Sequence, residues 1–126
     1  MRYLLDTNVL VYLLCAPQEL SPEAKRVVQT ERNLFASIAS FWEIAIKQSL
    51  GKLSIPLGIP EMEAVCRERN IGILPITASA IERIKTLPDI HRDPFDRLLV
   101  AQALDADLVL VTRDKAIPQY PVQTAW

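Results

Sequence analysis

The sequence predicts an α/β fold in three layers, with a central parallel sheet of four to five strands flanked by helices. Short apolar runs of strand length alternate along the chain with segments in which apolar residues recur at helical spacing. The short runs are continuously apolar, which is typical of parallel strands buried on both faces. The chain has 126 residues, half of them hydrophobic, so a single domain over residues 1–126 is expected.

Five apolar runs have the length and composition of strands. In chain order they are residues 2–5, 34–37, 71–76, 108–112 and 122–125. Six segments with helical spacing separate them, and these are residues 7–15, 22–32, 40–50, 61–70, 78–86 and 95–106.

Local chemistry predicts several helix boundaries. Ser21 and Asp93 each precede a proline, and this pair begins a helix because the side chain caps it and proline fits its first turn. Ser40 is expected to open the third helix, and Gly51 is expected to end it.

Charge and cysteine content narrow the class of protein. The formal charge is −1 and the pI is near 5.8. The chain therefore lacks the strong positive charge of a dedicated nucleic-acid binder, and RNA binding would depend on local basic groups. Cys15 and Cys66 form no CxxC pair and lie in apolar helical segments. We expect both to be buried free thiols in a reducing compartment.

No targeting segment is expected in this sequence. The first apolar run, residues 3–16, contains Asp6 and Asn8, which make it too polar for a signal peptide. The same run is too short to span a bilayer. These features predict a cytoplasmic protein without a membrane segment.

Four acidic residues are predicted to meet at one edge of the sheet. Asp6 follows the first strand and Asp114 follows the fourth. Glu43 and Asp96 are placed in the first turns of two helices, one after the second strand and one leading into the fourth. Helices in such folds run antiparallel to the strands, so their N-termini share an edge with the strand carboxyl ends, where ligands bind.

Such a cluster needs a compensating positive charge. At an effective dielectric of about 20, two like charges roughly 4–6 Å apart repel by about 3–4 kcal/mol. Oxygen ligands without a nearby cysteine favour Mg²⁺ or Mn²⁺. Metals held by carboxylates suit phosphodiester hydrolysis, because one ion activates water and another stabilises the leaving oxygen. Asp6, Glu43, Asp96 and Asp114 are therefore the predicted catalytic and metal-binding residues.

Each acid also has a simpler interpretation. Ser40 and Glu43 fit a capping box, a role that is compatible with metal binding. Asp96 is a favourable charge in a first helical turn, and Asp114 fits a turn or cap. Asp6 is the least easily explained, since a carboxylate that closes an apolar strand requires a partner. The hypothesis depends on the convergence of all four.

Polar residues beside the acids are candidates for supporting roles. Thr7, Asn8 and Thr112 lie at the same edge and are predicted to support the ligands or contact substrate. Arg97 and Arg113 each adjoin one of the acids and are candidates for phosphate contacts, with solvated surface charge as the alternative.

Four further residues are assigned structural roles. Lys47 is expected to pair with the acid four residues before it on the third helix, with a contact to substrate phosphate as the alternative. His91 is interpreted as structural, because metal-activated water makes a general base dispensable. Trp42 and Trp126 are expected to pack rather than to stack on bases.

Four segments resemble PIN-domain nucleases, and more closely the VapC-type toxins of type II toxin–antitoxin pairs. They are Leu4–Leu10 (LLDTNVL), Ser40–Ile44 (SFWEI), His91–Ala103 (HRDPFDRLLVAQA) and Val111–Asp114 (VTRD). The resemblance covers essentially the whole chain. It implies a PIN-like fold in which the four acids hold one or two Mg²⁺ or Mn²⁺ ions and Thr112 occupies a hydroxyl position beside the fourth.

The resemblance also implies an activity and partners. The reaction would be endonucleolytic hydrolysis of single-stranded RNA by metal-activated water, leaving 5′-phosphate ends. Proteins of this type form homodimers and are held inactive by a cognate antitoxin whose tail enters the acidic site. One departure is the segment Lys115–Pro118, because many relatives carry a phenylalanine three residues after the fourth acid.

Three other functions are considered. A phosphatase of the haloacid dehalogenase type requires a second aspartate two residues after the first, where this chain has Asn8. A receiver domain would need paired acids near its start, whereas Asp6 stands alone. A catalytically silent PIN-fold binding or regulatory module is the third alternative, and the complete set of four acids argues against it. Such a module would show no Mn²⁺-dependent thermal shift.

Overall fold

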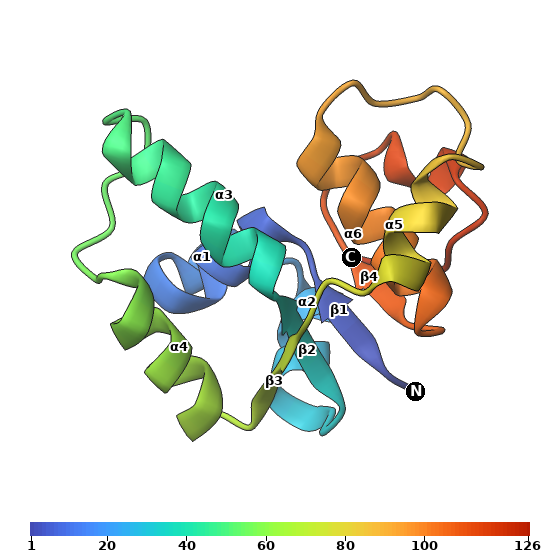
Figure 1. Cartoon of the computed structure of the whole chain (residues 1–126). Coiled ribbons are helices and arrows are strands. Elements are labelled where there is room, and N and C mark those ends of the chain that lie inside the picture. Colours follow the sequence, from blue (N-terminus) through green and yellow to red (C-terminus); the bar gives the residue numbers. More distant parts are fainter.

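The computed structural model describes all 126 residues and confirms the predicted α/β class (Figure 1). Five parallel strands form one sheet in the order β3-β2-β1-β4-β5. The strands are β1 (Tyr3–Leu5), β2 (Leu34–Ser37), β3 (Ile71–Leu74), β4 (Val109–Val111) and β5 (Thr124–Ala125). The helices are α1 (Thr7–Cys15), α2 (Pro22–Thr30), α3 (Ile38–Ser49), α4 (Ile59–Glu68), α5 (Ala78–Ile84) and α6 (Pro94–Asp105). Two 3₁₀ turns that we did not predict, η1 (Pro17–Glu19) and η2 (Ile117–Gln119), complete the chain.

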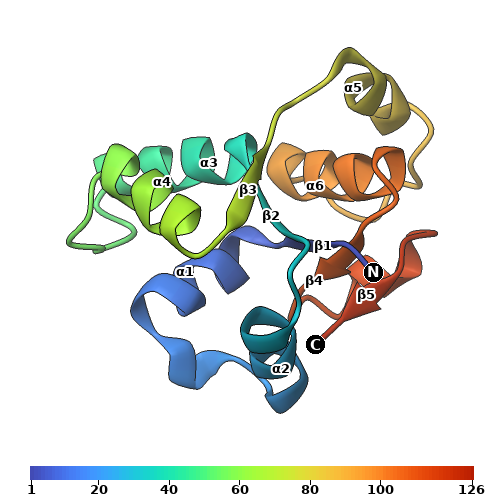
Figure 2. The same ribbon diagram turned by 90° about the horizontal axis from the view of Figure 1, so that it is seen from below.

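The sheet separates two apolar cores, and neighbouring residues of β1 face opposite cores. Tyr3 and Leu5 join the larger core, to which α1, α2, α3 and α4 contribute. Leu4 joins the smaller core with Leu99 of α6. Figure 2 shows α5 and α6 on the opposite side of the sheet from α1 and α2. The continuous apolar strands are therefore covered on both faces, as predicted.

The helix starts predicted from serine, aspartate and proline are confirmed for α2 and α6. The Ser21 hydroxyl accepts a hydrogen bond from the Ala24 backbone N–H at 3.0 Å. The Asp93 carboxylate accepts one from the Phe95 backbone N–H at 2.8 Å. Each bond satisfies a donor that lacks a partner within the helix.

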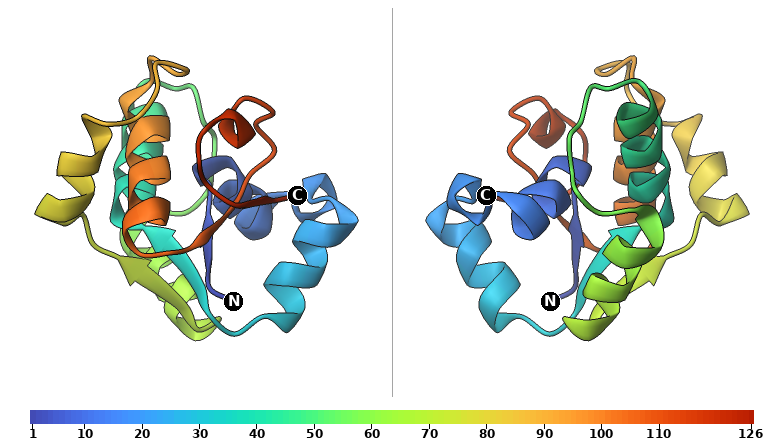
Figure 3. Two further views of the ribbon diagram at one scale, coloured as in Figure 1. Left: turned by 90° about the vertical axis from the view of Figure 1, so that its right-hand side faces the viewer. Right: turned by 90° about the vertical axis from the view of Figure 1, so that its left-hand side faces the viewer.

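The predicted start of α3 is wrong by two residues. The cap is Ser37, not Ser40, and its hydroxyl accepts from the Ala39 N–H at 3.0 Å while donating to Gln102 Oε1 at 2.6 Å. Because Ser37 also ends β2, no loop is available to turn the helix back along the strand. In Figure 3, α3 extends beyond the carboxyl end of β2 and lies beside α6.

The cysteines and tryptophans differ in how far they are buried. Cys66 is a buried free thiol as predicted, but Cys15 is exposed, because α1 ends there at the surface. Trp42 packs edge-to-face against Phe95, but it does so at the surface, with 59% of its area exposed. Trp126 packs against the larger core. None of the helices has the length and apolar character needed to cross a membrane.

Candidate functional site

Asp6 lies at the carboxyl end of the central strand and is buried with both carboxylate oxygens occupied. Oδ1 accepts from the Thr7 backbone N–H at 2.7 Å, which makes Asp6 the cap of α1. Oδ2 accepts from the Thr112 hydroxyl at 2.7 Å. The two hydrogen bonds lower the pKa of Asp6, but burial outweighs them and raises it above its usual value. The charges of Glu43 and Asp114 raise it further.

Thr112 connects two of the acids across neighbouring strands. Besides donating to Asp6, its hydroxyl accepts from the Asp114 backbone N–H at 3.0 Å. Asp114 Oδ1 accepts from the Ala116 N–H at 2.8 Å. Desolvation raises the pKa of Asp114, but this bond and the one from His91 outweigh it and hold the pKa below its usual value.

Glu43 is buried on α3, with 7% of its surface exposed. It lies in the second turn of the helix, not the first, and the capping box predicted for it is absent. Ser40 instead shares a 2.8 Å hydrogen bond with the Thr7 hydroxyl. The predicted pair with Lys47 is confirmed, with Nζ 2.8 Å from Oε2. Glu43 therefore has no capping role that would explain its burial.

Asp96 lies in the first turn of α6 and is half-buried. Desolvation raises its pKa to about 6, and the negative charges of Asp93, Asp6 and Glu43 add to this effect. The interaction with His91 lowers the pKa of Asp96. A carboxyl group whose ionisation is opposed by both burial and like charge is suited to a cation partner.

His91 was interpreted as structural, but its contacts with the site were not predicted from the sequence. Its Nε2 lies 2.7 Å from Asp114 Oδ2, and its Nδ1 lies 3.0 Å from the Tyr120 hydroxyl. His91, Asp96 and Asp114 bring one ligand atom each to within 4.8 Å of one another. The available signal was that His91 opens the segment His91–Ala103, which also contains Asp96.

The donor set fits a hard divalent cation. Thr112 links Asp6 to Asp114, ligand atoms of Asp96 and Asp114 lie within 4.8 Å of each other, and the charge of Glu43 raises the pKa of both Asp6 and Asp96. Lys47 is the only cationic side chain that forms an ion pair with Glu43, and Asp6 and Asp96 have none. A cation bound by carboxylate oxygens would relieve this repulsion. Asp6, Glu43, Asp96 and Asp114 are the residues that could hold it.

The remaining predicted residues divide into two groups. Thr7 and Thr112 are buried and hold the neighbouring groups as described. Asn8 is exposed. Both terminal nitrogens of Arg97 donate to backbone carbonyls, of Pro88 at 2.9 Å and Ile84 at 3.1 Å. Arg113 lies 3.5 Å from Glu19 at the surface. The structure thus gives both arginines partners within the protein.

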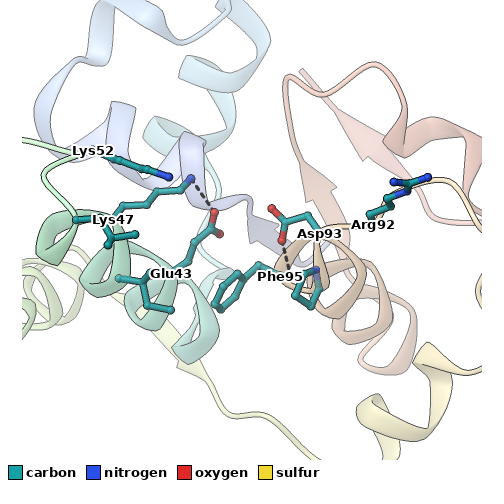
Figure 4. Close-up of a pocket in the computed structure, with 9 residues that line it drawn as sticks. Glu43, Lys47, Lys52, Arg92, Asp93 and Phe95 are labelled. Carbon is teal, nitrogen blue, oxygen red and sulfur yellow. Dashed lines mark hydrogen bonds and ion pairs between the residues drawn. The ribbon is translucent and has the colours of Figure 1, made fainter.

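A groove of about 460 Å³ adjoins the acids between α3 and the start of α6. Figure 4 shows Glu43 beside Lys47 and Lys52 on one wall, and Asp93 with Arg92 on the other. Lys52 and Arg92 are exposed and form no ion pair, so their charges are available to a ligand. The sequence analysis did not identify either residue.

Comparison with known protein families identifies the fold. The PIN domain family model matches residues 3–123. The chain belongs to the PIN-domain family. This PIN domain is 30% identical over 117 residues to ribonuclease VapC22 of Mycobacterium tuberculosis, a match that covers 90% of the chain and 88% of that protein.

Solved structures share the fold of this PIN domain at low sequence identity. The VapBC2 complex of Rickettsia felis, bound to a DNA fragment from its promoter, matches with a TM-score of 0.72 and 16% identity, covering 99% of this chain and 98% of that one. VapBC-1 from nontypeable Haemophilus influenzae matches with a TM-score of 0.67 and 22% identity, covering 99% and 97%. These matches confirm the predicted PIN-like fold.

Proposed function

We propose that this PIN domain is an endoribonuclease that depends on Mg²⁺ or Mn²⁺, hydrolyses single-stranded RNA and leaves 5′-phosphate ends. The observation that carries this proposal is the convergence of Asp6, Glu43, Asp96 and Asp114 at one sheet edge, with the pKa of Asp6 and of Asp96 raised. The 30% identity to a protein named as a ribonuclease supports the same activity.

The chain's own residues would hold the cation ligands in place. When bound, a divalent cation supplies the activation of water and the neutralisation of charge on the phosphate. Thr112 and the Thr7 backbone N–H fix both oxygens of Asp6, and Lys47 fixes one oxygen of Glu43. Because these ligands are oriented before the cation binds, less ordering is required at the moment of binding.

RNA is the substrate that best suits the charges around the acids. The chain as a whole is near neutral, but Lys52 and Arg92 place free positive charge on opposite walls of the groove beside Glu43. Phosphates on either side of the cleaved bond could contact these side chains. This local charge supplies what the net charge of −1 does not.

We further propose that the protein is the toxin of a toxin–antitoxin pair, held inactive by a cognate antitoxin, and that it forms a homodimer. Structures of VapBC pairs match the fold over nearly the whole chain. The acidic site offers an antitoxin the charge complementarity to receive a basic side chain. Measurement of the mass of the purified protein in solution, alone and after mixing with a candidate antitoxin chain, tests both partners.

The test of the activity compares four proteins on total RNA with Mg²⁺ or Mn²⁺. They are the wild type, Asp6→Asn, Asp96→Asn and the control Asp107→Asn. Asp107 is exposed at the other end of α6 and has a φ of 55°, which asparagine tolerates. We expect the wild type and the control to cleave, EDTA to stop them, and both site variants to be folded and inactive.

Other outcomes would contradict the proposal in distinct ways. Equal cleavage by all four proteins would show that the activity comes from a contaminant or another site. Absence of both cleavage and a Mn²⁺-dependent thermal shift would favour the silent binding module. Release of phosphate from a monoester, without RNA cleavage, would favour a phosphatase.

A further inference from the structure

His91 is enclosed by two side chains that reach it from other parts of the chain. Its side chain is 13% exposed and lies between Asp114, after β4, and Tyr120, after η2. The His91 and Tyr120 rings stack with centroids 5.5 Å apart and an interplanar angle of 15°. The Tyr120 hydroxyl also accepts a hydrogen bond from the His91 backbone N–H at 2.9 Å. Backbone and ring are therefore both fixed by the same tyrosine.

The hydrogen-bond network determines where the imidazole proton lies. A lone pair on Nε2 facing an ionised carboxylate at 2.7 Å would be repelled, so Nε2 carries a proton and donates it to Asp114 Oδ2. The Tyr120 hydroxyl accepts from the His91 backbone and has its own proton to donate to Nδ1 at 3.0 Å. In this arrangement neither imidazole nitrogen has a free lone pair for a metal ion.

We propose that His91, held by Tyr120, is a positioning residue that orients the Asp114 carboxylate for cation binding and is not itself a ligand. This inference rests on the proposed function. Asp114 is held at both oxygens, by His91 at Oδ2 and by the Ala116 N–H at Oδ1. A carboxylate oxygen has two lone pairs, so each retains one for a cation.

The same residues allow a different arrangement, which the experiment must separate. His91, Asp96 and Asp114 lie close enough to act as three direct ligands. A nitrogen ligand would shift preference from Mg²⁺ toward softer metals such as Zn²⁺. A positioning histidine would leave an all-oxygen site that prefers Mg²⁺ and Mn²⁺. The two arrangements therefore differ in whether nitrogen is bound to the metal.

Titration of the full-length protein with Mn²⁺, followed by electron paramagnetic resonance, tests the positioning role. The variants are His91→Ala, which removes the donor, His91→Gln, whose amide N–H can still donate to Asp114, and Tyr120→Phe, which keeps the ring but releases Nδ1. Loss of an outer hydrogen-bond partner typically weakens metal affinity by about 10–100-fold. We expect that loss for His91→Ala, recovery of most of the affinity in His91→Gln, and an intermediate loss for Tyr120→Phe.

Electron spin-echo modulation on the Mn²⁺-loaded wild type supplies an independent measurement. We expect no signal from a directly coordinated nitrogen. Such a signal, or equal weakness of His91→Gln and His91→Ala, would overturn the positioning role and make His91 a ligand. Equal Mn²⁺ affinity in the wild type and all three variants would overturn it as well. If the wild type itself fails to bind Mn²⁺, the proposed metal-dependent function fails, and this inference fails with it.

Discussion

Replacing Asp96 with asparagine should stabilise the metal-free protein at neutral pH. The pKa of Asp96 rises from 3.8 in the unfolded chain to about 6 in the fold, chiefly through burial. A shift of this size corresponds to about 3 kcal/mol, at about 1.4 kcal/mol per pKa unit. Because the carboxyl group is only half-buried, solvent screening reduces the penalty to about 1–1.5 kcal/mol.

The sign of the pH dependence follows from the direction of the shift. An acid whose pKa is raised in the folded state does not reduce the free energy of unfolding below pH 3.8, where it is protonated in both the folded and the unfolded protein. The penalty grows as the pH rises toward 6 and is complete above that value. Asp96→Asn should therefore be more stable than the wild type at pH 7, and this advantage should disappear near pH 4.

A second effect of the substitution must be subtracted. Asp96 is in the first turn of α6, where a negative charge stabilises the helix by about 0.3–1 kcal/mol. The net gain at pH 7 is then about 0.6 kcal/mol at the midpoints of the two ranges. Glu61→Gln is the matched control, because Glu61 is an exposed acid in the first turn of α4. This variant should show only the loss of the favourable helix charge, without a gain from relieved burial.

Urea denaturation at pH 4 and pH 7, with and without Mn²⁺, measures the free energy of unfolding of the wild type and both variants under each condition. A cation at about 100 times its Kd should add about 2.7 kcal/mol to the free energy of unfolding of the wild type. The variant should gain much less, so Mn²⁺ should reverse the order of stability. If metal-free Asp96→Asn is less stable than the wild type at pH 7 by as much as the control, Asp96 is an ordinary helix charge and the reasoning is refuted.

Three further predictions concern the groove, the hydroxyl bridge and the cap of α3. Lys52→Ala and Arg92→Ala should each reduce the salt dependence of RNA binding, measured by filter binding of a single-stranded RNA in Ca²⁺. The magnitude of the slope of log binding constant against log salt concentration should fall by about 0.7, with Mn²⁺ affinity unchanged. An unchanged slope would show that neither side chain contacts phosphate. Thr112→Val should cost about 1–3 kcal/mol, because a buried Asp6 oxygen loses its donor, while Thr112→Ser should stay near wild type in thermal unfolding. Ser37→Ala should destabilise the fold by about 1 kcal/mol in urea, and an unchanged midpoint would argue against its capping role.

Local chemistry was sufficient for the fold and for part of the site. Asp93 and its following proline predicted the start of α6, because a cap acts within a few residues of its own position. The start of α3 was not predictable in this way, since Ser37 and Ser40 are both suitable caps. The choice depends on Gln102, which lies 65 residues away in sequence and binds the Ser37 hydroxyl.

The same distinction explains which site residues were found. Asp6 and Asp114 could be placed because the carboxyl ends of parallel strands share one edge. The contacts of His91 could not be predicted, because they depend on Asp114 and Tyr120, which lie 23 and 29 residues away in sequence. Lys52 and Arg92 come together only through the packing of α3 beside α6.

The direct junction of β2 and α3 restricts how the sequence of this protein can change during evolution. Each residue added to a helix turns the following side chains by about 100° and moves them by about 1.5 Å. One residue inserted after Ser37 would rotate Glu43 away from the other acids without disturbing the sheet. Insertions and deletions should therefore be absent at this junction, whereas a change in the connection after α3 would leave the orientation of Glu43 unaltered.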